Sequence, residues 1–349
     1  MSSYQVIKVN IITGFLGAGK TTLIRHLLMQ VPDGENWAVL VNEFGEVGLD
    51  KDLLEADLKL DANMSLDNPA LLGNIAINQV AGGCLCCTTS AAFQVSLNTL
   101  IKRHNPDRIL IEPTGLGHPQ NILKQLKSPF YQSVLQLESV LCLLDARNLH
   151  DARYFNHPNF IEQVAMADTL IASKTELYQE RDWLAFNAYI TRVNPAKQRI
   201  EKIKQGRLAL TCLDNQKTLN DLLEPTDKNN APEDINVAED IKAVGFYSKT
   251  LGSETNLAWV FADDILFDHT KMVSWFEKIQ SLDALLRIKA VLRLDKQQAL
   301  LINASGLDHE LRRVDKMSRS KIELILNDEK LTYDDLSEIK ANVALLASS

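Results

Sequence analysis

The sequence has few cysteines, no long apolar run and no excess of positive charge. Its five cysteines are an odd number, which makes a poor disulfide framework, and Cys142 lies in an apolar run as a predicted buried hydrophobe. No apolar stretch approaches the roughly 18 residues that span a bilayer, and residues 1–10 lack a basic segment followed by an apolar one. The net charge of -8 argues against nucleic acid and anionic membranes as partners, because both are negatively charged. We therefore expect a cytoplasmic protein.

The order of apolar segments predicts the fold of the amino-terminal part. Near-continuous apolar and β-branched runs alternate with segments long enough for crossover helices, which is typical of a buried parallel sheet. We predict strands at Ile7–Thr13, Trp37–Val41, Arg108–Ile111, Val140–Leu144 and Thr169–Ala172, and helices at Thr21–Val31, Phe93–His104 and Pro119–Lys127. This alternation predicts a doubly wound α/β domain over residues 1–213.

A second, smaller domain is predicted after a polar stretch. Residues 214–240 contain asparagines and prolines that interrupt any sustained apolar pattern, so we interpret them as a linker. Strand-like runs follow at Ala243–Tyr247, Leu285–Leu294, Ala299–Ile302 and Ile322–Leu326, with helical patterns at Thr270–Ser281 and Tyr333–Leu346. Residues 241–349 should therefore form an α+β domain.

The segment GFLGAGKT, from Gly14 to Thr21, matches the pattern G-x-x-x-x-G-K-[ST] at every fixed position. It follows the first predicted strand and opens a predicted helix, which is the context that a phosphate-binding loop requires. Glycines let backbone amides close around phosphate oxygens, Lys20 neutralises the β- and γ-phosphates, and Thr21 offers a hydroxyl to Mg²⁺. The predicted nucleotide-binding residues of this loop are Gly14, Gly17, Ala18, Gly19, Lys20, Thr21 and Thr22. The motif therefore predicts a P-loop nucleotide hydrolase.

Two acidic motifs follow predicted strands. Glu112 and Gly115, in the motif EPTG, come after the strand Arg108–Ile111, at the edge where open α/β sheets bind ligands. Glu112 is a candidate ligand of Mg²⁺ or of its water, and the Gly115 amide is a candidate sensor of the γ-phosphate. Glu43 and Glu46, in the motif NEFGE, are candidates to position water or bind metal, or are simply solvated.

The segment SKTE, from Ser173 to Glu176, partly resembles the guanine-binding motif N-K-x-D. Lys174 matches the motif. Glu176 keeps a carboxylate that can accept hydrogen bonds from guanine N1 and N2, although its extra methylene shifts that group, and Ser173 reaches less far than asparagine. We expect GTP as the nucleotide, and these substitutions leave its selectivity over ATP open.

Three soft donors, Cys84, Cys86 and Cys87, lie close together in a glycine-flanked segment. Thiolates select Zn²⁺, Cu(I) or iron–sulfur centres over hard cations. Three local ligands are too few for a four-thiolate cluster within one chain, so the fourth donor would be Glu46, His118, a substrate, water or another subunit. A mononuclear metal site is the simpler interpretation.

Taken in order, the motifs GFLGAGKTT, NEFGE, GGCLCCT and EPTG resemble the CobW family of metallochaperone GTPases, relatives of the urease and hydrogenase nickel-insertion GTPases. The resemblance covers essentially the whole chain. The stretches WAVLVNEFGEVGLD, PDRILIEPTGLGHP and RIKAVLRL are most similar to the YeiR-like zinc-binding branch of that family.

The resemblance implies a GTPase domain with slow intrinsic hydrolysis, a zinc site linked to the nucleotide, and a carboxyl-terminal domain that contacts a client metalloprotein. Glu43 or Glu112 would orient the attacking water beside Lys20. A metal-dependent homo-oligomer is a further prediction. By resemblance, zinc is assigned to Cys84, Cys86, Cys87 and Glu46, and the magnesium-nucleotide to Gly17, Gly19, Lys20, Thr21, Glu112 and Lys174.

Some features depart from the family pattern. The linker lacks the histidine-rich stretch of several members, so additional metal storage is not expected there. Ala290 stands where a glycine is often found, and we have no physical account of this difference. The alternative functions are a nucleotide-regulated zinc buffer or sensor with little turnover, and an ATP-dependent iron–sulfur carrier.

Overall fold

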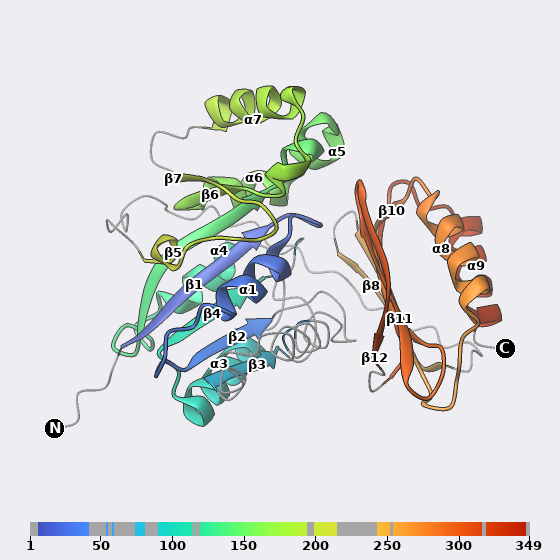
Figure 1. Ribbon diagram of the computed structural model, residues 1–349, viewed down its shortest axis with the longest axis horizontal. Helices are drawn as coiled ribbons and strands as arrows, with labels where there is room; N and C mark the ends of the chain where they lie inside the picture. The colour runs from blue at the N-terminus through green and yellow to red at the C-terminus, as the bar shows by residue number, and fades with distance from the viewer. Residues whose placement is uncertain are drawn as a thin grey trace. The chain divides into compact units, whose positions relative to one another are not determined.

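The computed structural model divides the chain into two compact units (Figure 1). The first contains the described residues up to Asp214, and the second contains those from Ala243 onward. The predicted linker and the exact domain bounds remain predictions, because the intervening residues lie outside the described part of the chain. The structure describes residues 6–41, 54, 58, 74–80, 90–113, 115, 119–193, 199–214, 243–251, 254–315 and 319–346.

A seven-stranded parallel sheet forms the centre of the first unit, in the order β3-β2-β4-β1-β5-β6-β7. Its strands are β1 (Ile7–Gly14), β2 (Trp37–Val41), β3 (Ile75–Gln79), β4 (Arg108–Glu112), β5 (Leu135–Leu144), β6 (Thr169–Ala172) and β7 (Arg199–Lys202). The central strands are buried along nearly their whole length, as their apolar composition predicts.

Helices cover both faces of this sheet. On one face, Leu23 and Leu27 of α1 pack against Ile12, whereas Phe93 of α3 belongs to the core on the opposite face with Ile11. Alternate residues of β1 thus enter different cores, which confirms the predicted doubly wound fold. The described α-helices are α1 (Lys20–Leu28), α3 (Ser90–His104), α4 (Pro119–Leu126), α5 (Ala152–Phe155), α6 (Pro158–Ala165) and α7 (Glu180–Val193), and the 3-10 helices are η2 (Ala146–His150), η3 (Thr175–Leu177) and η4 (Leu210–Cys212).

A polar network joins the amino-terminal halves of two central strands to the last described residue of the unit. The Arg108 guanidinium donates to Asn10 Oδ1 at 2.5 Å and to Asp214 Oδ1 at 2.6 Å. Lys8 Nζ donates to the same Asp214 oxygen at 3.1 Å, and Asn10 Nδ2 donates to the Leu213 carbonyl at 2.7 Å. These bonds fix residues 213 and 214 near the amino ends of β1 and β4, whereas the phosphate loop lies at the carboxyl end of β1.

The second unit is an antiparallel sheet with two helices, α8 and α9, side by side on one face (Figure 1). Its strand order is β12-β11-β10-β13-β9-β8. The core between sheet and helices includes Trp259, Ile288 and Leu324 from the strands, and Trp275 and Ile339 from the helices. The elements are β8 (Ala243–Leu251), β9 (Glu254–Phe261), α8 (His269–Gln280), β10 (Leu285–Arg293), β11 (Gln298–Ser305), β12 (Asp308–Asp315), β13 (Lys321–Asn327) and α9 (Tyr333–Leu346).

The predicted α+β class of this unit is confirmed. None of the helices in the described ranges has both the length and the apolar character needed to cross a membrane.

Candidate functional site

The carboxyl ends of four neighbouring strands bring the candidate nucleotide-binding residues together. Strands β4, β1, β5 and β6 are adjacent and parallel, so the segments that follow them meet at one edge of the sheet. The phosphate loop follows β1, Glu112 ends β4, Asp145 follows β5, and Lys174 lies just after β6.

The phosphate loop has a backbone that suits glycine. Gly14, Gly17 and Gly19 have φ values of 145°, 70° and 93°, a region that L side chains rarely adopt. A Cβ atom at Gly14 would also lie 2.7 Å from the Leu143 carbonyl oxygen of the neighbouring strand. Helix α1 begins directly after Gly19, so its amino terminus faces the loop and favours bound anions.

Lys20 and Thr21 lie at the start of α1, where sequence analysis predicts the phosphates and Mg²⁺. The Lys20 ammonium is buried and donates to the carbonyl oxygens of Gly14 at 2.9 Å and Phe15 at 3.3 Å. Thr21 Oγ1 donates to Glu112 Oε1 at 3.2 Å. A hydroxyl and a buried carboxylate are oxygen donors of the kind that Mg²⁺ prefers, so these two side chains fit the ion.

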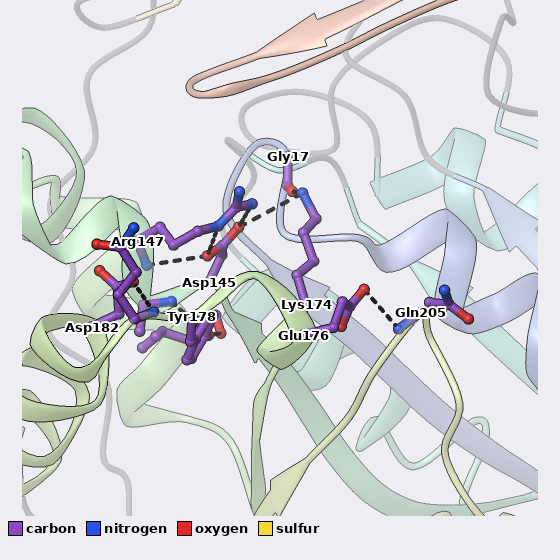
Figure 2. A network of polar contacts seen from close by, with 11 residues as sticks. Gly17, Asp145, Arg147, Lys174, Glu176, Tyr178, Asp182 and Gln205 are labelled. Carbon is purple, nitrogen blue, oxygen red and sulfur yellow. Dashed lines mark hydrogen bonds and ion pairs between the residues drawn. The ribbon is translucent and has the colours of Figure 1, made fainter.

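Lys174 connects the SKTE segment to the phosphate loop, as Figure 2 shows. Its ammonium donates to the Gly17 carbonyl at 2.6 Å and lies 3.7 Å from Asp145 Oδ2. Asp145 is buried, and Arg147 donates to its two oxygens at 3.0 and 2.5 Å. This charge-assisted network joins the ends of β5 and β6 to the phosphate loop.

Tyr178 holds the backbone on either side of Asp145. Its hydroxyl donates to the Leu144 carbonyl at 3.1 Å and accepts from the Ala146 amide at 2.7 Å. Burial raises the pKa of Tyr178, so the phenol remains a donor at neutral pH.

Glu176, the candidate guanine ligand, contacts the segment after β7. Its Oε1 accepts a hydrogen bond from the backbone N–H of Gln205 at 3.2 Å (Figure 2). Ser173, the first residue of the motif, is buried, with 2% of its surface exposed. The Glu176 carboxylate is thus bonded to the segment after β7, whereas Ser173 is buried in the first unit.

Gly115 lies against the phosphate loop. A Cβ atom built at this glycine would be 2.9 Å from Leu16 Cδ2 and 3.2 Å from Lys20 Nζ, so the backbone here approaches the lysine closely. Its carbonyl accepts from Gln163 Nε2 of α6 at 3.0 Å. The structure therefore brings Gly115 and Lys20 together, as their proposed roles on the same phosphate require.

Several predicted site residues lie outside the described ranges: Glu43, Glu46, Cys84, Cys86 and Cys87. Within those ranges, no three histidine, cysteine, aspartate or glutamate side chains are grouped to hold a metal ion. Cys142 is buried, as predicted, and burial raises the pKa of its thiol to about 12, so it is not a thiolate at neutral pH.

Five residues of the described site were not identified from the sequence: Asp145, Arg147, Gln163, Tyr178 and Gln205. A signal existed for Asp145, because it is an acidic residue directly after an apolar strand. Gln163 and Gln205 have no local signal, since their contacts to Gly115 and Glu176 span 48 and 29 positions of sequence.

Comparison with known families identifies the first unit. The family model described as "CobW/HypB/UreG, nucleotide-binding domain" matches residues 8–201, which is more than half of the chain. The chain belongs to the CobW/HypB/UreG family. This membership confirms the family that the four motifs predicted.

Relatives of this CobW/HypB/UreG protein extend beyond the nucleotide-binding domain. "Zinc chaperone YeiR" of Escherichia coli is 35% identical over 332 residues, which cover 92% of this chain and 94% of that protein. "Zinc chaperone CobW" of Pseudomonas aeruginosa is 29% identical over 235 residues, which cover 61% of this chain and 60% of that one. The crystal structure of Zn(II)-bound YjiA GTPase from E. coli aligns with 98% of this chain and 99% of its own, at 23% identity and a TM-score of 0.43.

Proposed function

We propose that this protein is a zinc metallochaperone GTPase, which couples GTP binding and hydrolysis to the loading of zinc or its release to a client metalloprotein. The observation that carries this proposal is the 35% identity, over 92% of the chain, to a protein named a zinc chaperone. The arrangement of Lys20, Thr21 and Glu112 supports the part of this proposal that concerns GTP binding and hydrolysis.

In the proposed nucleotide site, backbone amides of the phosphate loop and the amino terminus of α1 bind the phosphates. Lys20 would exchange the Gly14 and Phe15 carbonyls for phosphate oxygens. Thr21 and Glu112 would hold Mg²⁺, which would supply neutralisation of the charge on the β- and γ-phosphates. Glu43 or Glu112 orients the attacking water. Hydrolysis by positioning and charge stabilisation alone accounts for the slow intrinsic rate that we expect.

On the base side, Glu176 accepts hydrogen bonds from guanine N1 and N2, which favours GTP over ATP. Lys174 supports the phosphate loop through the Gly17 carbonyl and helps to set the distance between the base and phosphate subsites. Thr22 and Ala18 complete the loop around the phosphates.

Zinc is the cargo in this proposal. The thiolates of Cys84, Cys86 and Cys87 bind it, and Glu46 is the proposed fourth ligand. The motifs NEFGE and EPTG are ordered by the γ-phosphate, and this ordering changes access to the cysteines.

Zinc titration against a competing chromophore tests the coupling, in the presence of GTP, GDP or no nucleotide. We expect tight binding that changes with GTP, and loss of that binding when Cys84, Cys86 and Cys87 are all changed to alanine. Cys212→Ala is the matched control, because it removes a buried thiol from the first unit and should leave zinc binding unchanged. Equal zinc affinity with GTP and GDP would exclude the coupling and favour a zinc buffer.

The remaining parts of the proposal concern domains and partners. A domain of residues 1–213 hydrolyses GTP, a linker spans 214–240, and residues 241–349 form the domain that contacts the client. We also propose a cytoplasmic location, a metal-dependent homo-oligomer, and no nucleic-acid or membrane partner. The brown colour and visible absorbance of anaerobically purified protein would instead indicate an iron–sulfur carrier.

A further inference from the structure

Helix α6 presents one buried face to the candidate nucleotide site. The helix is capped by His157, whose Nδ1 accepts from the Asn159 amide at 3.2 Å, and Pro158 occupies its first position. Phe160 and Gln163 are three residues apart and both are buried, so they lie on the same side of the helix. This single face carries one aromatic and one amide side chain toward the site.

The aromatic side chain contacts the phosphate loop. Phe15, which lies inside the loop and is 4% exposed, has its ring centroid 6.0 Å from that of Phe160, in an edge-to-face arrangement. The rings of His157 and Tyr154 lie 4.8 and 5.3 Å from Phe15. The amino-terminal part of α6 is therefore packed against the loop that binds the phosphates.

The amide side chain contacts the other phosphate-facing segment. Gln163 is 1% exposed and donates from Nε2 to the Gly115 carbonyl at 3.0 Å. A Cβ atom built on Gly115 would lie 3.2 Å from Lys20 Nζ, so the backbone of Gly115 closely approaches the ammonium beside which the γ-phosphate is expected. Glycine has the widest range of backbone conformations, because it has no Cβ. The hydrogen bond from Gln163 to the Gly115 carbonyl therefore restricts a backbone that would otherwise be free to change conformation.

We propose that Gln163 is a positioning residue for the γ-phosphate: it holds Gly115 beside Lys20 and thereby links the phosphate-sensing segment to α6. The inference rests on the proposed function, because it assumes that Gly115 contacts the γ-phosphate of GTP. Since Phe160 of the same helix contacts Phe15, α6 joins the phosphate loop and the Gly115 segment in one packed unit. Gln163 therefore contributes to discrimination between GTP and GDP and not to nucleotide binding in general.

The distinction follows from which phosphates each segment reaches. The α- and β-phosphates are bound by the loop amides and α1, whereas Gln163 donates to the carbonyl of Gly115, the proposed γ-phosphate sensor. GDP lacks the γ-phosphate, so its affinity should not depend on how Gly115 is held. GTP affinity should depend on it, because a Gly115 segment that is no longer fixed must be ordered when the nucleotide binds.

The test is nucleotide affinity of the full chain, measured with fluorescent GDP and a fluorescent non-hydrolysable GTP analogue in the presence of Mg²⁺. Gln163→Leu keeps a side chain of similar size and removes the amide donor. We expect the affinity for the GTP analogue to fall about fivefold, the scale of one lost hydrogen bond, with GDP affinity unchanged. Gln163→Glu, which keeps the shape and replaces the donor by an acceptor, should lower GTP affinity at least as much.

Gln30→Leu is the matched control, because Gln30 Nε2 also donates to a backbone carbonyl of the first unit, that of Leu208, at 3.0 Å. This control should leave the ratio of the two affinities at the wild-type value. If both Gln163 variants changed GTP and GDP affinity by the same factor, or changed neither, the positioning role would be wrong. Failure of the wild-type protein to bind the GTP analogue would instead overturn the proposed function itself.

Discussion

Strands β2 and β4 of the parallel sheet differ from β9 and β13 of the antiparallel sheet in where their polar groups lie. In the parallel sheet, the interiors of β2 and β4 are apolar, and the charged side chains Glu112 and Asp145 stand where strands end. In the antiparallel sheet, polar groups lie within the strands: Asn256 Nδ2 of β9 donates to Glu323 Oε1 of β13 at 2.8 Å, and both are buried.

This difference indicates where candidate catalytic groups lie in each unit. A sheet that is covered on both faces holds few polar groups along its strands, and here Asn10 and Glu138 are buried in the amino-terminal halves of β1 and β5. The candidate reactive groups lie instead at the carboxyl ends of the strands, where ligands of open α/β sheets bind. An antiparallel sheet needs only one apolar face, and here that face packs against α8 and α9. Perturbing the second unit should therefore affect stability, whereas perturbing the strand ends of the first should affect turnover.

The largest expected effect is on stability, from Trp259→Ala in the second unit. Trp259 is fully buried in the core under α8 and α9, and the cavity should lower the free energy of unfolding of that unit by about 3–5 kcal/mol. Differential scanning calorimetry should show one transition shifted to lower temperature and a second one unmoved. Trp259→Phe, which retains most of the ring volume, should shift the same transition much less. A single transition that moves as a whole would contradict separate stability of the two units.

The next effect is on catalysis, from Lys20→Ala. Loss of the ammonium that stabilises phosphate charge should reduce the rate of GTP hydrolysis by about 100-fold or more, by analogy with the removal of one transition-state donor. Release of inorganic phosphate under saturating GTP measures this. Lys8→Ala is the control: it removes a lysine near the start of β1 that pairs with Asp214, and turnover should be unchanged. Equal loss in both variants would mean that the effect on turnover reflects folding.

The smallest effect is pH-dependent and concerns α7. The Asp182 carboxylate accepts from the backbone N–H of Gln179 at 2.7 Å, which is half of a capping box at the start of the helix. It also accepts from His150 Nε2 at 2.7 Å. Burial acts to raise the pKa of Asp182, but the bonds from Gln179 and His150 outweigh it, and the pKa is lowered. The carboxylate thus contributes stability above its unfolded pKa, which is lost as pH falls through the folded value.

Asp182→Asn should therefore reduce the free energy of unfolding by about 1 kcal/mol at pH 7, and the difference from wild type should shrink below about pH 4. Urea unfolding at a series of pH values measures it. Glu180→Gln, in the same first turn but exposed, should have little effect at any pH. A difference that persists at pH 3 would show that the loss is not due to charge.

Most central strands were predictable because burial makes their composition distinctive, but the interior strand β9 (Glu254–Phe261) was missed. Trp37–Val41 and Thr169–Ala172 were predicted with the observed bounds. The edge strands β3, β7 and β12 were missed, and β7 (Arg199–Lys202) has charged residues and is mostly exposed. The edge strand β8 was predicted over part of its length, at Ala243–Tyr247. The start of β5 was also missed, because its first five residues include Gln136, Glu138 and Ser139, and Glu138 and Ser139 are buried despite being polar. Only tertiary contacts explain such residues in a strand.

The candidate site was predictable where a local pattern encodes the chemistry. The phosphate loop, Glu112, Gly115 and Lys174 meet at one edge of the sheet, and each of them follows a strand identified from its apolar run. Gln163 could not be found in this way, because a glutamine within an amphipathic helix looks like many others. Its significance depends on the fold bringing α6 beside Gly115.

The network of Asn10, Arg108 and Asp214 has a practical consequence for dissecting the protein. A nucleotide-binding fragment that ends at residue 213 would leave the buried Arg108 guanidinium without the carboxylate to which it donates at 2.6 Å. A fragment that continues past Asp214 keeps this pair and the bond to Lys8. We therefore expect a fragment that retains Asp214 to be more stable than one that ends at residue 213, so an expression boundary for the nucleotide-binding domain should be chosen after Asp214.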